Sequence, residues 1–280
     1  MPASRLRRRR ISGVSLLLAV VLALGLYVAL HRVAPLLSGS DCAVGGSGQQ
    51  ITLGTGQAGI AATIAGVAQR DALPARAVIV AYAAAWQESK LQNLPYGDRD
   101  SVGVFQQRPS QGWGKRSQLE NPVYATSKFF SALAKVPGYQ RMPVYQAAQA
   151  VQRSADGFAY QRFQTMAAHM AAAFTGQDPH AVWCWYTPAV SGTARVAAAS
   201  RGLARAFGPH VTRAAADPGL IVRVVSVRQG WAVATWLVSH AQQYQIDDVR
   251  YADYQWTAVH GGQGWARTVS PAPPRSVVFG

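Results

Sequence analysis

The chain has 280 residues, of which 49% are hydrophobic and 14% are charged, and its formal net charge is +15. This composition excludes an intrinsically disordered chain, because enough apolar residues are present to bury a core. The basic excess fits nucleic acid or the anionic polymers of a Gram-positive cell wall. No nucleic-acid-binding motif is visible, so we favour the wall and expect no specific nucleic-acid partner.

A basic tail over residues 1–10 precedes an apolar stretch that carries no charge from residue 11 to residue 30. About 20 such residues span a bilayer as a helix, and the arginines before them place the N-terminus in the cytoplasm. We therefore predict a single-pass transmembrane anchor over residues 11–33 in the cell membrane, with the rest of the chain outside the cell at the wall. A cleaved signal peptide is the alternative, although its apolar region usually runs to only about 7–15 residues.

Glycine and serine are frequent over residues 34–56, which predicts a flexible linker between the membrane and the first folded domain. The chain has two cysteines, Cys42 and Cys184. Outside the membrane an even number of cysteines suggests a disulfide, and this pair brackets the next predicted domain. Two unpaired thiols are the alternative. We predict no metal site, because no further cysteine is present and no histidine lies at ligand spacing.

Apolar residues at helical spacing predict a helix over residues 57–72, and Pro74 begins a second helix that ends at Glu88. Proline at the start of a segment and a capping side chain before it are typical of helix N-termini. On these signals we predict three further helices, which begin after Asn121 at Pro122, run from Pro143 to about residue 154, and cover residues 157–175.

Glu88 lies at the C-terminal end of an apolar helical stretch that runs from Ala77 to Trp86. The helix dipole disfavours a negative charge there by about 0.3–1 kcal/mol, and partial burial disfavours it further. We therefore expect a raised pKa and a proton on Glu88 near neutral pH, as a general acid requires. A surface glutamate where a helix emerges into solvent is the alternative.

The loop after this helix carries two carboxylates, Asp98 and Asp100, and then a glycine followed by two apolar residues and a glutamine. Gly103 lets the backbone approach another group closely. The amide of Gln106 both donates and accepts, as recognition of a sugar amide or hydroxyl requires. Trp113 is suited either to stacking on a sugar face or to packing in the core.

Three short motifs, Glu88-Ser89, Gly97-Asp98-Arg99 and Gly103-Val104-Phe105-Gln106, resemble those of the soluble lytic transglycosylase and goose-type lysozyme superfamily. The surrounding residues are similar to the form common in actinobacterial cell-wall proteins. The resemblance implies a lysozyme-like domain, which we place at residues 57–178, and peptidoglycan glycan strands as substrate. It implies that Glu88 is the general acid and base and that Ser89 orients it or the leaving group. No cofactor is implied.

The same resemblance implies that Gln106 and the backbone of Val104 and Phe105 line the sugar cleft. The third motif of the superfamily, Ala-Tyr-Asn-x-Gly, has only a partial counterpart at residues 150–154. Gln152 is expected to replace the asparagine amide in binding substrate. Val151 replaces the tyrosine that often contacts the catalytic glutamate, so Tyr145 or Tyr160 is left as a possible source of the hydroxyl.

Two reaction outcomes are open at this point. A lytic transglycosylase uses Glu88 alone and leaves a 1,6-anhydro product. A lysozyme-type hydrolase needs a second carboxylate about 6.5–9.5 Å away to activate water, and Asp98 and Asp100 are the candidates. A third hypothesis is an inactive glycan-binding scaffold in a secretion or conjugation machine, against which the retention of Glu88 and Gln106 argues.

The predicted organisation ends with a linker over residues 179–198 and a small α/β accessory domain over residues 199–280, so the overall class is α+β. The elements expected after residue 190 are a helix over 194–207, strands over 220–227, 249–256 and 276–279, and a helix over 230–244. His210, His240 and His260 are too scattered for a metal site, and we expect them to be satisfied or exposed. We therefore interpret this domain as noncatalytic.

Overall fold

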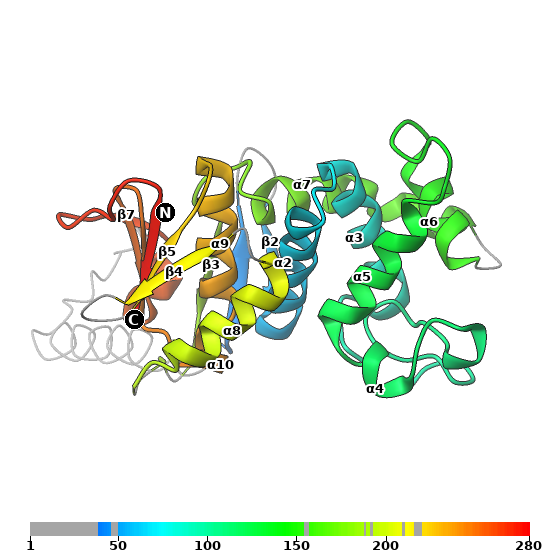
Figure 1. Ribbon diagram of the computed structural model, residues 1–280, viewed down its shortest axis with the longest axis horizontal. Helices are drawn as coiled ribbons and strands as arrows, with labels where there is room; N and C mark the ends of the chain where they lie inside the picture. Colours follow the sequence, from blue (N-terminus) through cyan, green and yellow to red (C-terminus); the bar gives the residue numbers. More distant parts are fainter. Residues whose placement is uncertain are drawn as a thin grey trace, which may run out of the picture. The chain divides into compact units, whose positions relative to one another are not determined.

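The computed structural model describes residues 39–45, 50–153, 157–187, 189–190, 193–208, 211–215 and 220–280. Within them, Ser40–Gly280 form one compact unit of mixed helices and sheets, as the predicted α+β class requires (Figure 1). The predicted basic tail and transmembrane anchor lie outside the described residues. In the part that is described, no helix is both long enough and apolar enough to cross a membrane.

Two alanine-rich helices, α2 (Thr55–Arg70) and α3 (Ala75–Ser89), confirm the first two predicted helices. They are joined by a short turn, and the buried hydroxyl of Tyr82 on α3 donates to the carbonyl oxygen of Ala61 on α2 at 2.8 Å. The helix α3 ends where Lys90 adopts a left-handed conformation with φ of 56°. That end places Glu88 and Ser89 in the last turn.

The remaining helices of the predicted lysozyme-like region follow in chain order. They are α4 (Arg116–Leu119), α5 (Pro122–Leu133), α6 (Val144–Gln152) and α7 (Gln164–Phe174), with 3₁₀ segments η1 (Pro109–Gln111) and η2 (Gly157–Phe163). Asn121 caps α5 as predicted, because its Oδ1 accepts the N–H of Val123 at 3.0 Å. The single helix predicted over 157–175 is instead η2 followed by α7.

A three-stranded antiparallel sheet lies where we predicted linkers. Its strands β1 (Asp41–Val44), β2 (Ile51–Gly54) and β3 (Val182–Trp185) are arranged in the order β2-β1-β3. The linker predictions over 34–56 and 179–198 are therefore wrong at these strands, each of which is only four residues long. Cys42 and Cys184 face each other across β1 and β3 and form the predicted disulfide.

A six-stranded antiparallel sheet forms the C-terminal part, with β4 (Thr212–Ala215), β5 (Leu220–Arg223), β6 (Asp248–Tyr251), β7 (Tyr254–Thr257), β8 (Ala266–Arg267) and β9 (Ser276–Phe279) in the order β4-β5-β9-β6-β7-β8. The strand predicted over 276–279 is confirmed. The one predicted over 249–256 is wrong, because the chain reverses at Ala252, whose φ is 53°, and gives the hairpin β6–β7.

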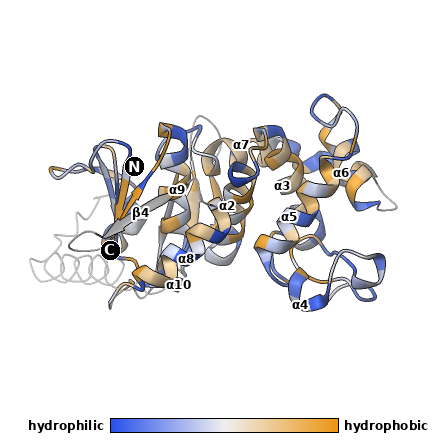
Figure 2. Ribbon diagram, in the orientation of Figure 1, coloured by the Kyte–Doolittle hydropathy of each residue, from blue (hydrophilic) through white to orange (hydrophobic). Residues whose placement is uncertain are grey.

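Three further helices, α8 (Val196–Phe207), α9 (Val227–Ser239) and α10 (Ala241–Tyr244), belong to the same region. The helices α8 and α9 both pack against α2. Figure 2 shows that hydrophobic residues are frequent along α3 and α9, whereas the loops around α4 are mainly hydrophilic. The accessory region and the lysozyme-like region predicted from the sequence thus share one packed core along α2.

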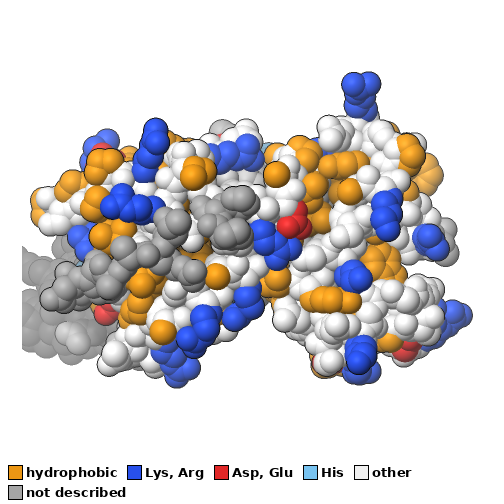
Figure 3. Space-filling model, in the orientation of Figure 1, with side chains coloured by type: hydrophobic (Ala, Val, Ile, Leu, Met, Phe, Trp, Pro, Cys, Tyr) orange, Lys and Arg blue, Asp and Glu red, His pale blue; other side chains and the backbone are white. Residues whose placement is uncertain are grey.

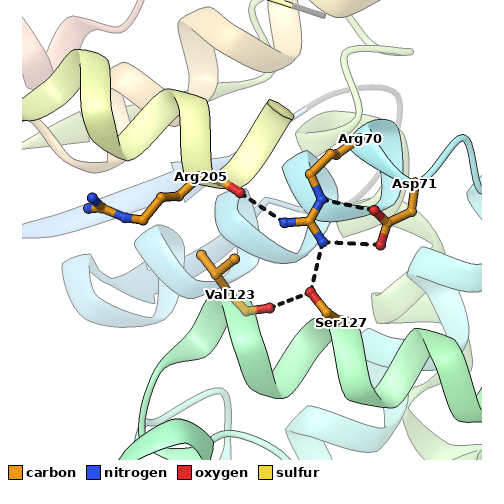
Figure 4. A network of polar contacts seen from close by, with 5 residues as sticks. All are labelled: Arg70, Asp71, Val123, Ser127 and Arg205. Atoms are coloured by element: carbon orange, nitrogen blue, oxygen red, sulfur yellow. Dashed lines mark hydrogen bonds and ion pairs between the residues drawn. The ribbon is translucent and has the colours of Figure 1, made fainter. Parts of the chain in front are cut away.

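Lys and Arg side chains are spread over the visible face of the molecule (Figure 3), but Arg70 is turned between three helices (Figure 4). Its guanidinium donates to the carboxylate of Asp71 at 2.8 Å, to Ser127 Oγ at 2.7 Å and to the carbonyl oxygen of Arg205 at 2.9 Å. Ser127 in turn donates to the carbonyl oxygen of Val123 at 2.8 Å. One cation therefore joins α2, α5 and α8.

Candidate active site

Glu88 is half-buried in the last turn of α3. Its Oε1 accepts a hydrogen bond from the hydroxyl of Tyr160 at 2.7 Å. Tyr160 lies on η2, 72 residues further along the chain, and is fully buried. Of the two candidate tyrosines, it is Tyr160 that contacts the glutamate, whereas Tyr145 stacks on Phe158 with ring centroids 4.9 Å apart. The contact fixes the orientation of the Glu88 carboxyl group.

Ser89 joins the end of α3 to the loop over residues 96–107, which carries the two glycine-containing motifs and is called the motif loop. Its buried hydroxyl lies 2.7 Å from the carbonyl oxygen of Val104 and 3.1 Å from that of Ala85, and it accepts the N–H of Gln92 at 3.1 Å. A serine hydroxyl has one proton to donate, and the shorter contact is the one to Val104. Ser89 therefore positions the loop beside Glu88 through backbone contacts.

The motif loop needs glycine at Gly103. This residue has φ of 77°, and a Cβ added to it would lie 2.3 Å from the carbonyl oxygen of Leu119. Gly97 lies against Gln106, since a Cβ at Gly97 would lie 1.8 Å from Gln106 Oε1. The Nε2 of Gln106 donates to the carbonyl oxygens of Gly103 at 3.1 Å and Tyr96 at 3.3 Å. Both amide donors are engaged within the loop, so contact with a sugar would use the amide oxygen.

Val104 and Phe105 are fully buried, and the ring of Phe105 stacks on Phe129 with centroids 4.5 Å apart. Their side chains anchor the loop in the core. The carbonyl oxygen of Val104 accepts from Ser89, and that of Phe105 accepts from Gln152 Nε2 at 2.8 Å. The backbone that the resemblance assigns to the sugar cleft is thus held from two sides by predicted site residues.

The two candidate bases differ in environment. The Asp98 side chain is 90% exposed and lies 3.9 Å from Arg99 Nε. Asp100 accepts hydrogen bonds from Arg108 Nε at 2.8 Å, Ser110 N at 2.7 Å and Ser110 Oγ at 3.0 Å. The hydrogen bond from the Arg108 guanidinium is the main reason that the pKa of Asp100 lies well below its usual range, and the hydrogen bond from the Ser110 N–H is the second. A carboxylate so stabilised is a weak proton acceptor.

A cavity of about 690 Å³ lies between the Trp113 segment, α5 and the C-terminal end of α6. Trp113 and Gln152, both predicted to bind substrate, line it together. Glu88 is not among its lining residues. The motif loop connects the cavity to Glu88. Gln152, which lines the cavity, donates a hydrogen bond to the carbonyl oxygen of Phe105, and Ser89, next to Glu88, donates one to that of Val104. The cavity and Glu88 therefore flank the same loop.

In the described ranges, no group of three or more His, Cys, Asp or Glu side chains is placed to hold a metal ion. Arg108, the partner of Asp100, was not among the residues predicted for the site. Neither were the cations that line the cavity, which are Lys128, Lys135 and Arg153. The seven-residue spacing of the two lysines, about two helical turns, was the signal that α5 and the turn after it would bring them to the same side.

No protein-family model matches this chain, and no curated protein is detectably similar to it in sequence. The resemblance to the lysozyme-like superfamily thus rests on the short motifs.

Proposed function

We propose that this protein cleaves the β-1,4 bond between MurNAc and GlcNAc in peptidoglycan as a lytic transglycosylase. The observation that carries the proposal is the hydrogen bond from Tyr160 to Glu88, in the turn where Ser89 binds the motif loop. A half-buried carboxyl group in a fixed orientation is suited to general acid catalysis. The adjoining cavity, lined by Trp113 and Gln152, has the size of a small-ligand pocket.

In the proposed reaction, Glu88 gives its proton to the GlcNAc O4 as the bond from that oxygen to the MurNAc C1 breaks. The Glu88 carboxylate then removes the proton from the MurNAc C6 hydroxyl, whose oxygen forms the new bond to C1. The products are a GlcNAc with a free O4 hydroxyl and a 1,6-anhydro-MurNAc end. Glu88 is protonated again, and no water is consumed.

Two observations favour this reaction over hydrolysis. A hydrolase of the inverting type needs a second carboxylate as a base for water. Asp100 is bound by Arg108 and Ser110, and its pKa is lowered by them. Asp98 is almost fully exposed to solvent. A mechanism in which Glu88 is the only catalytic carboxyl group does not require Asp98 or Asp100 to act as a base.

The proposal includes the location of the protein at the wall side of the cell membrane, held by the segment over residues 11–33. The disulfide between Cys42 and Cys184 supports an oxidising environment for the folded part. Glycan strands are the proposed partner there.

The test is digestion of purified sacculi by the full-length protein, with product masses recorded. We expect muropeptides with anhydro ends, one water lighter than the reducing ends that a hydrolase leaves. Glu88→Gln should lower the rate by roughly 10²–10⁴-fold, the usual contribution of a general acid. Asp253→Asn is the matched control, because Asp253 is ion-paired with Arg267 in the C-terminal sheet, and it should leave the rate unchanged.

Unchanged lysis by Glu88→Gln would remove Glu88 from the mechanism. Reducing ends from the wild-type protein would replace the transglycosylase with a hydrolase. Glycan binding without any cleavage would favour the inactive scaffold.

A further inference from the structure

Three cations share the cavity that adjoins the motif loop: Lys128, Lys135 and Arg153. All three residues are exposed. Lys128 lies on α5 and Lys135 on the turn that follows it, so the two lysines form one wall. Arg153 follows α6 and lines the cavity from there. No acidic residue belongs to the described lining of this cavity.

The described part of the chain does not neutralise these cations. It contains six ion pairs, and none of them includes Lys128, Lys135 or Arg153. The Nζ of Lys128 lies 5.4 Å from the centre of the Tyr124 ring instead. Unpaired positive charges around a cavity concentrate the electrostatic field there and attract negatively charged ligands.

We propose that this cavity binds the carboxylates of the peptide stem carried by the glycan strand. The inference rests on the proposed function, because that function supplies a substrate in which peptide and sugar are joined. The cavity is suitably placed, since Gln152 is at once a lining residue and a donor to Phe105 in the motif loop. Sugar bound at the loop would hold its stem toward Lys128 on α5 and Lys135 after it.

The spacing of the cations fits a short peptide. Lys128 on α5 and Lys135 on the turn after it are about two helical turns apart, which corresponds to about 10 Å, or roughly three residues of extended chain. The cavity volume of about 690 Å³ lies within the range of pockets that enclose small ligands. A peptide of a few residues with more than one carboxylate matches both the length and the charge of this site.

The test measures binding by the full-length Glu88→Gln protein, so that the probes are not consumed. One probe is a soluble MurNAc–GlcNAc oligosaccharide with its peptide stems, and the other is the same oligosaccharide after an amidase has removed them. We expect the stem-bearing probe to bind roughly threefold to tenfold more tightly. Because the cations are exposed, the difference should shrink as salt is added.

When Lys128→Gln and Lys135→Gln are added to the Glu88→Gln protein, most of the difference in affinity between the two probes should disappear. Binding of the stem-free probe should stay unchanged. The matched control, Arg201→Gln with Arg223→Gln, removes the same charge from exposed positions on α8 and β5 and should keep the difference. The side chains substituted in each added pair are exposed, so the unfolding midpoints of both variants should agree with that of the Glu88→Gln protein and exclude a folding defect.

Equal binding of both probes by the Glu88→Gln protein, or an equal loss in the control pair, would overturn the inference. So would competition by a soluble glycerol-phosphate polymer that exceeds competition by free stem peptide, which would indicate a phosphate polymer as occupant. Residual lysis by Glu88→Gln tests the proposed function separately, because the stem preference is measured by binding alone.

Discussion

The Glu88 carboxyl group is held by a hydroxyl that reaches it from a distant segment. Tyr160 is fully buried, so its ring is fixed by the core and its hydroxyl has little freedom to leave the 2.7 Å contact. Val151 stands where the resemblance to the superfamily would place a tyrosine, and the hydroxyl that contacts Glu88 comes from η2 and not from α6.

Tyr160→Phe tests this contact at the scale of one atom. The substitution keeps the buried ring and removes only the hydroxyl, so we expect kcat for sacculus lysis to fall by roughly tenfold, in line with hydrogen bonds to charged groups. The dissociation constant for glycan should change little. The control is Tyr145→Phe, whose hydroxyl accepts only from Gln146 among the described contacts. Equal rates for both variants would contradict a role for Tyr160.

At the residue scale, the sequence predicted the groups but not their partners. Glu88, Ser89 and Gly103 stand in short motifs that are legible without a structure. The contact of Tyr160 spans 72 residues and depends on how η2 packs against α3, which no local pattern encodes. The ion pair between Arg108 and Asp100 could have been predicted from the sequence, because the two residues are only eight positions apart.

At the scale of elements, the motif loop is a tight structure fixed at several points. An isolated bridge pairs Val102 with Gln107, and the N–H of Gly103 donates to the carbonyl oxygen of Leu94 at 2.7 Å. Ser89 and Gln152 bind its carbonyl groups from α3 and α6. The loop therefore moves with the helices that carry the proposed site.

Gly103→Ala should disturb this loop through two separate effects. Its φ of 77° disfavours any side chain, and the new Cβ would lie 2.3 Å from the Leu119 carbonyl oxygen. Gly112→Ala is the control, since Gly112 has φ of 79° but no atom within 4 Å of an added Cβ. We expect unfolding free energy to fall by about 1–2 kcal/mol for Gly112→Ala and by clearly more for Gly103→Ala, measured by denaturant titration. Equal losses would contradict the close approach to Leu119.

The helices were predictable where apolar residues repeat over three or more turns, as in α2, α3 and α5. The short strands were not. β1 and β2 have four residues each, and β3, which pairs with β1, lies far along the chain, since the paired cysteines are 142 positions apart in sequence. Stability of such strands comes from pairing with distant chain, which a local pattern does not reveal.

At the scale of the whole compact unit, α2 lies between the motif-bearing helices and the C-terminal helices. His240, at the end of α9, stacks on Trp236 with ring centroids 4.0 Å apart, and its Nδ1 lies 2.8 Å from the Trp236 carbonyl oxygen. A Cβ added to Gly59 on α2 would lie 3.3 Å from Nε2 of His240. Its ring is satisfied, as expected, and burial lowers the pKa of His240 to about 4.

This lowered pKa predicts a loss of stability in acid. In the unfolded chain His240 takes up a proton near pH 6.5, whereas in the folded protein it stays neutral down to about pH 4. Between these values the unfolded state binds more protons, so unfolding free energy falls as the pH decreases, by up to about 3 kcal/mol. Urea unfolding at a series of pH values measures this. His240→Gln should flatten the profile in that window, and parallel profiles would contradict the assignment.

The disulfide between β1 and β3 has a mechanical consequence. β1 is the central strand of its sheet, and Cys42 is covalently joined to Cys184 across it. When the compact unit is stretched between the residues before Gly39 and its C-terminal strands, the tension passes from Cys42 directly to Cys184. The segment between the two cysteines, which are 142 positions apart in sequence, includes Glu88, the motif loop and the cationic cavity and does not carry that load.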